Sequence, residues 1–231
     1  MLAPGQGRSL GNVQAHAAGA DYDCAASICD PSCIGNCTNP GYDRTTQCSQ
    51  HVERDIGGGG VGLNVAQGAA LAGCEQIIAV DLRPSALALA REFGATHTIE
   101  ALAGNVAEAV RDLTGGRGAD YVFDTVGTPT TISQALECTR KGGTVVLTGL
   151  SRTDALASIP TFLFVMQEKR LIGSLYGSGQ PAQDIPRLVA LYQAGKLKLR
   201  ELVTRSYRLD GVNEALAALA SGVDARGIIR W

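Results

Sequence analysis

Apolar residues follow two regular spacings from about residue 56 onward. Short runs that are apolar on both faces, such as those at 77–80 and 145–147, alternate with longer segments whose apolar residues recur at i, i+3, i+4 and i+7. The first spacing is typical of strands in a parallel sheet covered on both sides, and the second of helices with one buried face. The alternation predicts an α/β fold with a doubly wound parallel sheet of six strands.

The elements can be placed along the chain from these runs. Strands are predicted at 52–56, 76–81, 96–99, 121–124, 144–148 and 171–176. Helices are predicted around 61–72, 106–113, 132–139, 185–192 and 212–219. The first strand is weak, because it holds the consecutive charges Glu53, Arg54 and Asp55, and unpaired charges are costly to bury.

The first part of the chain has a different composition. Residues 1 to about 50 are rich in Gly, Ala, Ser, Thr, Asn, Asp and Cys, and neither spacing is sustained there. A segment of this kind buries little apolar surface, and partial disorder is one interpretation of it. We therefore divide the chain into an irregular, Cys-rich segment at 1–50 and a Rossmann-type domain at 51–231 that ends in a C-terminal tail.

A glycine-rich turn precedes the first predicted helix. Gly57, Gly59 and Gly62 form the pattern G-x-G-x-x-G. In dinucleotide-binding folds these glycines permit a tight turn, close approach of a pyrophosphate and close packing of the helix on the strand. The helix that starts near Val61 would offer free N–H groups and its positive dipole end to the phosphates. A flexible loop without a ligand is the alternative interpretation.

An acidic residue ends the second predicted strand. Asp81 lies 24 residues after Gly57, where a carboxylate accepts hydrogen bonds from the adenosine ribose. This carboxylate would repel the 2′-phosphate of NADP, so the sequence favours NAD. Arg83 lies two residues further on and could soften that preference. The alternative role of Asp81 is that of a turn residue.

Four stretches carry a family resemblance in their order and spacing. They are GGGGVGLNVAQGAALAG at 57–73, IIAVDLRPSALALAREFGATHTI at 77–99, GADYVFDTVG at 118–127 and KGGTVVLTGL at 141–150. Together they resemble the zinc-type alcohol dehydrogenases of the medium-chain dehydrogenase/reductase family, and most of all the class III-like bacterial members. The resemblance covers about residues 56–231 and includes the final ARGIIRW.

The resemblance implies a two-domain enzyme that oxidises alcohols reversibly to aldehydes or ketones with NAD. In that family a catalytic zinc polarises the alcohol oxygen, and hydride passes to the nicotinamide. The implied cofactor-binding residues are Gly57, Gly59, Gly60, Val61, Gly62 and Arg226 at the pyrophosphate, Asp81 at the ribose, Thr125, Val126 and Gly127 on the adenosine and nicotinamide-ribose side, and Thr148, Gly149 and Leu150 near the nicotinamide. For Arg226 a solvated surface arginine is the alternative.

The resemblance also implies a second subunit. The stretch RLIGSLYG at 170–177 is similar to the sixth strand of the family, which pairs with its copy in a dimer. An uncovered apolar edge strand favours such pairing. We therefore expect a homodimer through the edge strand near Leu171 to Tyr176.

The metal ligands of the family are not matched. We find no G-x-C-H and no G-H-E motif, and the histidines are His16, His51 and His97. The structural zinc lobe of the family has the spacing C-x2-C-x2-C-x7-C, whereas C-x4-C-x3-C-x3-C-x10-C separates Cys24, Cys29, Cys33, Cys37 and Cys48. The resemblance thus leads us to expect zinc, but we assign no metal ligand and no catalytic residue, and the family's catalytic domain is largely missing.

Composition narrows the class of protein. The net charge of -2 gives no basic surface for nucleic acid. No apolar stretch approaches the roughly 20 residues that span a bilayer, and the N-terminus lacks the apolar core of a signal peptide. The odd number of seven cysteines argues against a disulfide framework. We expect a cytoplasmic protein without nucleic-acid or membrane partners.

Three functions remain open at this point. The first is an NAD-dependent alcohol dehydrogenase, intact or impaired, acting on a small alcohol or aldehyde. The second is a non-catalytic NAD-binding or dimerisation module. The third, a methyltransferase, is disfavoured by the tight glycine turn and the dimer-strand resemblance. The pair Tyr192 and Lys196 fits Y-x-x-x-K of short-chain dehydrogenases, but it lies after the sixth strand, so we regard it as chance.

Overall fold

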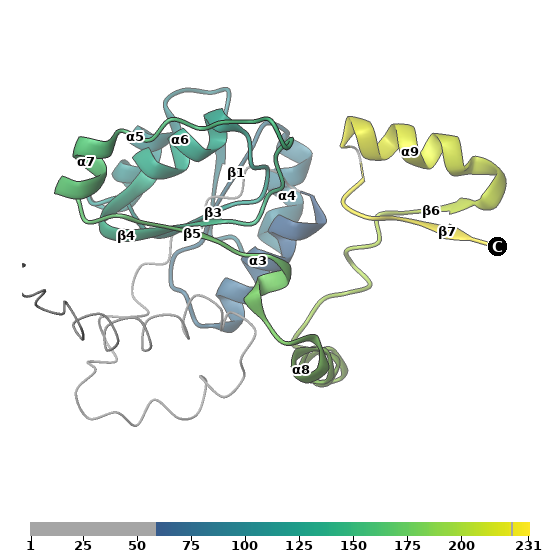
Figure 1. Cartoon of the computed structure of the whole chain (residues 1–231). Helices are drawn as coiled ribbons and strands as arrows, with labels where there is room; N and C mark the ends of the chain where they lie inside the picture. Colours follow the sequence, from purple (N-terminus) through teal and green to yellow (C-terminus); the bar gives the residue numbers. More distant parts are fainter. Residues whose placement is uncertain (1–58, 223) are drawn as a thin grey trace, which may run out of the picture.

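The computed structural model describes residues 59–222 and 224–231 (Figure 1). Its helices are α3 Gly60–Leu71, α4 Pro84–Glu92, α5 Val106–Leu113, α6 Pro129–Cys138, α7 Thr161–Met166, α8 Pro181–Gln193 and α9 Val212–Ser221, with short 3-10 helices η3 Tyr176–Ser178 and η4 Leu209–Gly211. Its strands are β1 Ile78–Asp81, β2 His97–Glu100, β3 Ala119–Asp124, β4 Thr139–Leu147, β5 Arg170–Gly173, β6 Arg205–Arg208 and β7 Gly227–Arg230. The irregular segment predicted at 1–50, the strand predicted at 52–56 and Gly57 lie outside the described residues.

The described strands pair in parallel in three small sheets, ordered β1-β2, β3-β4-β5 and β6-β7. The predicted single sheet of six strands is therefore not found among them. In the doubly wound order 3-2-1-4-5-6 the first strand separates the second from the fourth. The observed pairs are the neighbours on either side of that position, and the strand predicted to fill it is the one at 52–56, outside the described residues.

Helices cover both faces of β1, as a doubly wound fold requires. Ile78 and Val80 belong to one apolar core with residues of α5, α6, β3 and β4. Ile77 and Ala79, which alternate with them, belong to a second core with residues of α3 and α4. Because alternate residues of a strand point to opposite faces, these two cores lie on opposite sides of the strand.

Local signals explain where several helices begin. The side chain of Asn105 accepts the N–H groups of Ala107 and Glu108 at 3.0 and 3.3 Å and caps α5. Helix α6 starts with Pro129, and the Thr128 and Thr131 side chains form a capping box around its first turn. These caps satisfy backbone N–H groups that a helix start leaves without partners.

The structure moves several predicted boundaries, and two of them have a clear local cause. The strand predicted at 171–176 ends at Gly173, because Tyr176, Gly177 and Ser178 adopt positive φ angles of 51°, 71° and 55° and form η3. The helix predicted at 132–139 ends at Cys138, since Thr139 has extended backbone angles and begins β4. Helices α4 and α7 and strands β6 and β7 were not predicted.

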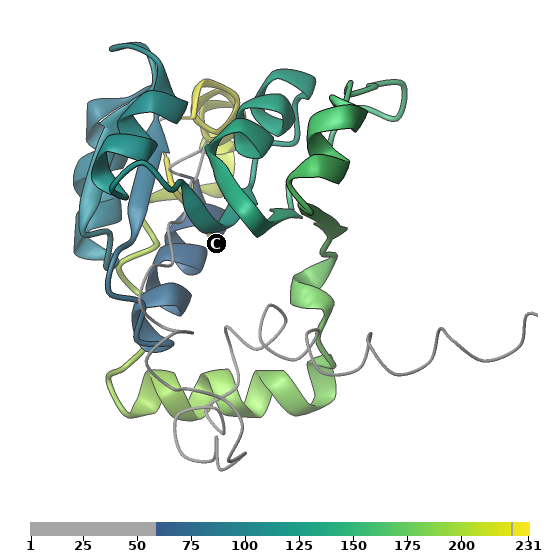
Figure 2. The same ribbon diagram turned by 90° about the vertical axis from the view of Figure 1, so that its left-hand side faces the viewer.

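The C-terminal part of the chain forms its own small group of elements. Strands β6 and β7 pair, and α9 packs against them, at the right of Figure 1. Helix α8 lies at the bottom of both views (Figures 1 and 2). The backbone of Lys198, after α8, exchanges two hydrogen bonds with the side chain of Gln67 on α3, at 2.9 and 3.3 Å. No helix within 59–222 and 224–231 has the length and apolar character needed to cross a bilayer.

Candidate functional site

The glycine turn leads directly into α3. Gly59 is the N-cap residue, with extended backbone angles (φ −79°, ψ 174°), and no side chain caps the helix start. Gly60 and Val61 begin the helix, Gly62 is buried within it, and Val61 is exposed. A helix start without a side-chain cap leaves N–H groups to be satisfied by water or by a ligand, and its dipole favours an anion.

Arg226 lies against this helix start. A Cβ atom on Gly60 would lie 3.1 Å from the carbonyl oxygen of Ala225 and 3.2 Å from Nη2 of Arg226. The backbone of Arg226 is held on both sides by Thr204: the Thr204 N–H donates to its carbonyl at 3.0 Å, and its own N–H donates to the Thr204 hydroxyl at 3.4 Å. The fold thus brings together Gly60 and Arg226, two predicted site residues far apart in sequence, and places the Arg226 guanidinium beside the start of α3.

The segment before Arg226 is fixed by a buried carboxylate. Asp224 accepts a hydrogen bond from the Tyr207 hydroxyl, which raises the pKa of Tyr207. Its Oδ1 atom lies 3.7 Å from Nε of Arg205 and 3.4 Å from the Thr204 hydroxyl. These contacts with β6 and with Thr204 fix the chain at Asp224, which lies two residues before Arg226.

Asp81 lies at the carboxyl end of β1 and is buried, with 4% of its surface exposed. Its Oδ1 atom accepts the backbone N–H of Arg83 at 2.8 Å and lies 3.5 Å from the Arg83 Nε atom. The Arg83 guanidinium also reaches Gly222, where a Cβ atom would lie 2.9 Å from its Nη1 atom. The carboxylate is therefore fixed at the strand end, with part of its charge neutralised by Arg83.

One segment joins the Asp81 region to the start of α3. Gly222 contacts Arg83, and Arg226, four residues further on, contacts Gly60. Four residues span at most about 14 Å of extended chain. Gly222 and Arg226, which contact Arg83 and Gly60 respectively, therefore lie within about 14 Å of each other, so one short segment connects the two regions.

The loops after β3 and β4 are organised by Asp124. One of its carboxylate oxygens accepts the N–H groups of Val126 and Gly127, both at 3.0 Å, and the other accepts the Thr131 hydroxyl at 2.9 Å. Its backbone carbonyl accepts the N–H groups of Thr148 and Gly149, both at 2.9 Å. Asp124 is 1% exposed, and sequence reasoning placed it only as the last residue of a strand.

The two loops meet through two glycines. A Cβ atom on Gly127, which has φ of +81°, would lie 2.5 Å from the Gly149 carbonyl oxygen, and one on Gly149 would lie 2.5 Å from the Gly127 nitrogen. The predicted residues Thr125, Val126 and Gly127 thus lie beside Thr148, Gly149 and Leu150, at the carboxyl ends of adjacent strands. In open α/β sheets this is the edge at which ligands bind.

The described residues do not supply a metal site. Within 59–222 and 224–231, no three His, Cys, Asp or Glu side chains come together in a way that could hold a metal ion. Among the described residues Cys74 and Cys138 form no disulfide, and His97 Nδ1 lies 2.9 Å from the Thr96 hydroxyl. The remaining histidines and cysteines of the sequence, at 16, 51, 24, 29, 33, 37 and 48, lie outside the described residues.

Comparison of the sequence with known proteins points to one family. Residues 60–194 match the family model described as zinc-binding dehydrogenase. The chain is 44% identical over 174 residues to an NDMA-dependent alcohol dehydrogenase of Amycolatopsis methanolica, covering 74% of this chain and 47% of that protein. It is 37% identical over 168 residues to a geraniol dehydrogenase of Castellaniella defragrans, covering 72% of this chain and 44% of that protein.

Solved structures agree with the sequence comparison. An alcohol dehydrogenase zinc-binding domain protein from Burkholderia ambifaria superposes with a TM-score of 0.74 at 34% identity, covering 79% of this chain and 49% of that one. A zinc-binding dehydrogenase from Sinorhizobium meliloti, solved with NADP bound, gives a TM-score of 0.67 at 26% identity, covering 84% and 54%. The chain spans about half the length of these relatives. Because the family model matches more than half of its residues, this chain belongs to the zinc-binding dehydrogenase family.

Proposed function

We propose that this chain binds NAD(H) along the carboxyl ends of its strands and serves hydride transfer between an alcohol and an aldehyde. The observation that carries the proposal is the contact of Arg226 with Gly60, at a helix start without a side-chain cap. A guanidinium and free N–H groups at one point are suited to a pyrophosphate. The absence of a Cβ atom at Gly60 lets the Arg226 guanidinium approach the first turn of α3.

Each part of the cofactor has proposed partners in this arrangement. The pyrophosphate is assigned to Gly57, Gly59, Gly60, Val61, Gly62 and Arg226. The adenosine ribose is assigned to Asp81, whose buried carboxylate accepts hydrogen bonds from two hydroxyl groups. The nicotinamide half is assigned to the loops at 125–127 and 148–150, which Asp124 holds side by side. Asp124 is a positioning residue in this proposal, because its carboxylate is occupied by the loop itself.

The bound nicotinamide would supply a hydride acceptor for alcohol oxidation. The role proposed for the described residues is to bind and orient this cofactor. Zinc is the metal expected from the family, but the described side chains do not fit it, because no three suitable donors come together. We therefore derive no step through zinc and assign no catalytic residue, and we propose that alcohol oxidation by this chain is impaired.

A non-catalytic NAD-binding or dimerisation module is the second candidate function. It is favoured by the same lack of a donor set within 59–222 and 224–231. Both candidates require NAD(H) binding, and they differ in turnover. With NAD, a simple primary alcohol and added zinc, the first predicts NADH formation and the second predicts none.

Titration with NADH tests the binding proposal directly. Nicotinamide fluorescence is followed for the wild-type chain and for the Asp81→Ala and Gly59→Ala variants, with Asp112→Ala, an exposed aspartate on α5, as the control. The wild type and the control are expected to bind NADH, and the two site variants to bind it more weakly. A wild-type chain that does not bind NADH would remove the proposal.

We further propose that the chain forms a homodimer through the edge near Leu171 to Tyr176. Strand β5 pairs with β4 on one side, and no other described strand pairs with it. Leu175 and Tyr176, just after the strand, are 65% and 90% exposed. Exposed apolar side chains beside an edge strand favour pairing with a second copy. A cytoplasmic location stays a prediction from the sequence.

A further inference from the structure

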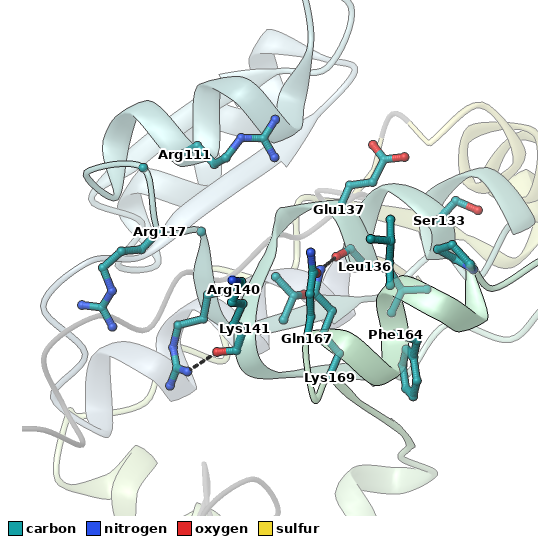
Figure 3. Close-up of a pocket in the computed structure, with 15 residues that line it drawn as sticks. Arg111, Arg117, Ser133, Leu136, Glu137, Arg140, Lys141, Phe164, Gln167 and Lys169 are labelled. Atoms are coloured by element: carbon teal, nitrogen blue, oxygen red, sulfur yellow. Dashed lines mark hydrogen bonds between the residues drawn. The ribbon is translucent and has the colours of Figure 1, made fainter.

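A cavity of about 540 Å³ opens at the edge of the sheet opposite the proposed cofactor site (Figure 3). Gly118 precedes β3, Thr139 begins β4 and Lys169 precedes β5, and all three line the cavity. Because the strands are parallel, this edge holds their amino ends, whereas Asp81 and Asp124 lie at carboxyl ends. The cavity is therefore separate from the cofactor site.

The cavity lining carries an excess of positive charge. The lining includes one carboxylate, that of Glu137, and five cationic side chains, which are those of Arg111, Arg117, Arg140, Lys141 and Lys169. Arg140 is paired with Asp120 near the start of β3. Arg111, Lys141 and Lys169 are three further cations of the lining, against the one carboxylate of Glu137. In Figure 3, Arg111 on α5 lies across the cavity from Gln167 and Lys169. This surplus favours an anionic ligand.

Lys169 is a partly buried cation of this lining. Its ammonium group donates a hydrogen bond to the Leu136 carbonyl at the end of α6. Burial lowers the pKa of Lys169, and the neighbouring Arg111 acts in the same direction, whereas Cys138 and Glu137 raise it. A half-buried ammonium that is repelled by a guanidinium would be stabilised by an anion between them.

One wall of the same cavity is apolar. Leu136 of α6 and Pro160, Leu163 and Phe164 at the start of α7 line it. Leu163 is half exposed, so part of this wall is open to a ligand. The volume lies within the range of roughly 300–1,000 Å³ that is usual for small-molecule sites.

We propose that this cavity is a second binding site, for a small phosphate ester whose organic part is apolar. The phosphate lies between Arg111 and Lys169, and the organic part contacts Leu163 and Phe164. Arginine and lysine are the side chains that bind phosphate most strongly, and a phosphate dianion neutralises more of the positive charge of the lining than a single carboxylate does. The proposal does not depend on NAD binding, because the two sites share no residue.

Phenyl phosphate and inorganic phosphate are the probes that test it. Binding to the full chain is followed by amide NMR signals, which separate the cavity (Gly116, Gly118 and Lys169) from the start of α3 (Gly60). Phenyl phosphate is expected to shift the cavity signals and to bind about fivefold or more tightly than inorganic phosphate, because only the ester contacts the apolar wall. Shifts confined to Gly60, or none at the cavity, would overturn the proposal.

Three variants make the test specific. Lys169→Gln and Arg111→Gln are expected to weaken phenyl phosphate binding about tenfold or more, since each removes a charge-assisted hydrogen bond. The exposed Arg200→Gln, which removes the same charge elsewhere, is expected to change it little. Leu163→Ser is expected to reduce the advantage of phenyl phosphate over inorganic phosphate. If the cavity variants and Arg200→Gln lost phenyl phosphate affinity equally, the effect would be due to net charge alone and the site would be rejected.

Discussion

Arg226 lies over Gly60, with its Nη2 atom 3.2 Å from the position that a Cβ atom on residue 60 would take. The contact joins the C-terminal tail to the first turn of α3. It depends on glycine at position 60 and on Thr204, which holds both backbone polar groups of Arg226. The geometry of the proposed pyrophosphate site can therefore be changed by a single methyl group.

Gly60→Ala is expected to weaken NADH binding about tenfold, equivalent to about 1.4 kcal/mol. The added Cβ atom would crowd the Ala225 carbonyl and displace the Arg226 guanidinium. The free energy of unfolding should change little, because alanine favours the helix while the contact opposes it. Gly104→Ala is the control, since nothing lies within 4 Å of its Cβ position. NADH titration and urea unfolding of both variants separate the two effects, and unchanged NADH affinity in Gly60→Ala would contradict the assignment.

Asp81→Ala is expected to weaken NADH binding about tenfold to a hundredfold. Hydrogen bonds to a charged group contribute about 1.5–3 kcal/mol, and the variant removes the acceptor proposed for the ribose hydroxyls. Arg83→Ala is the informative partner, because Arg83 neutralises part of the Asp81 charge. Its loss should lower NADPH affinity more than NADH affinity, since the carboxylate then repels the 2′-phosphate fully. Titration with both cofactors measures this, and an equal effect on both would show that Arg83 has no part in the preference.

Gly149→Ala is expected to lower the free energy of unfolding by about 1–3 kcal/mol. The new Cβ atom would lie 2.5 Å from the Gly127 nitrogen, so the loops after β3 and β4 would have to separate. Urea unfolding measures the loss, with Gly104→Ala again as the control. A stability equal to that of the wild type would mean that the two loops do not pack as closely as the structure places them.

Asp124→Ala is expected to cost about 2 kcal/mol or more of folding stability. The variant leaves the N–H groups of Val126 and Gly127 and the Thr131 hydroxyl without their acceptor. Asp124→Asn keeps one carbonyl oxygen as an acceptor and should lose less folding stability than the alanine variant. Thermal or urea unfolding compares the stabilities of the two variants. An alanine variant as stable as the asparagine variant would rule out the positioning role.

The parts of the fold with strong apolar spacing could be predicted from sequence. Strands β1 to β4 overlap four predicted strands, and β1 and β4 contain the two runs that are apolar on both faces, although β4 begins five residues earlier than expected. Helix α4, whose buried residues are Ala86, Leu87 and Ala90, was not predicted. Strands β6 and β7 are four residues long and end in charged residues, so their pairing depends on tertiary contacts. The end of β5 at Gly173 follows from the positive φ of Tyr176, which no apolar pattern encodes.

The candidate site was predictable to a different degree. The glycine turn, Asp81 and Arg226 were named from a motif and a family resemblance, and the structure places Arg226 at that turn. The organising role of Asp124 was not foreseen, because two of its five partners belong to the loop that follows it, one to α6 and two to the residues after β4. The cationic cavity was also missed, since its residues are spread from 111 to 169 and meet only when α5, α6 and α7 pack at one edge.

The edge strand β5 predicts the oligomeric state of the chain. The chain of 24.0 kDa is expected to sediment as a dimer, because β5 has one partner strand among the described strands and is followed by exposed Leu175 and Tyr176. Leu175→Asp combined with Tyr176→Asp should convert it to a monomer, since two copies of the edge would then bring like charges together. Leu156→Asp, at a residue 88% exposed and distant in sequence from β5, is the control for added charge. Sedimentation equilibrium distinguishes the outcomes: a monomeric wild type rejects the dimer, and a double variant that stays dimeric moves the interface away from this edge.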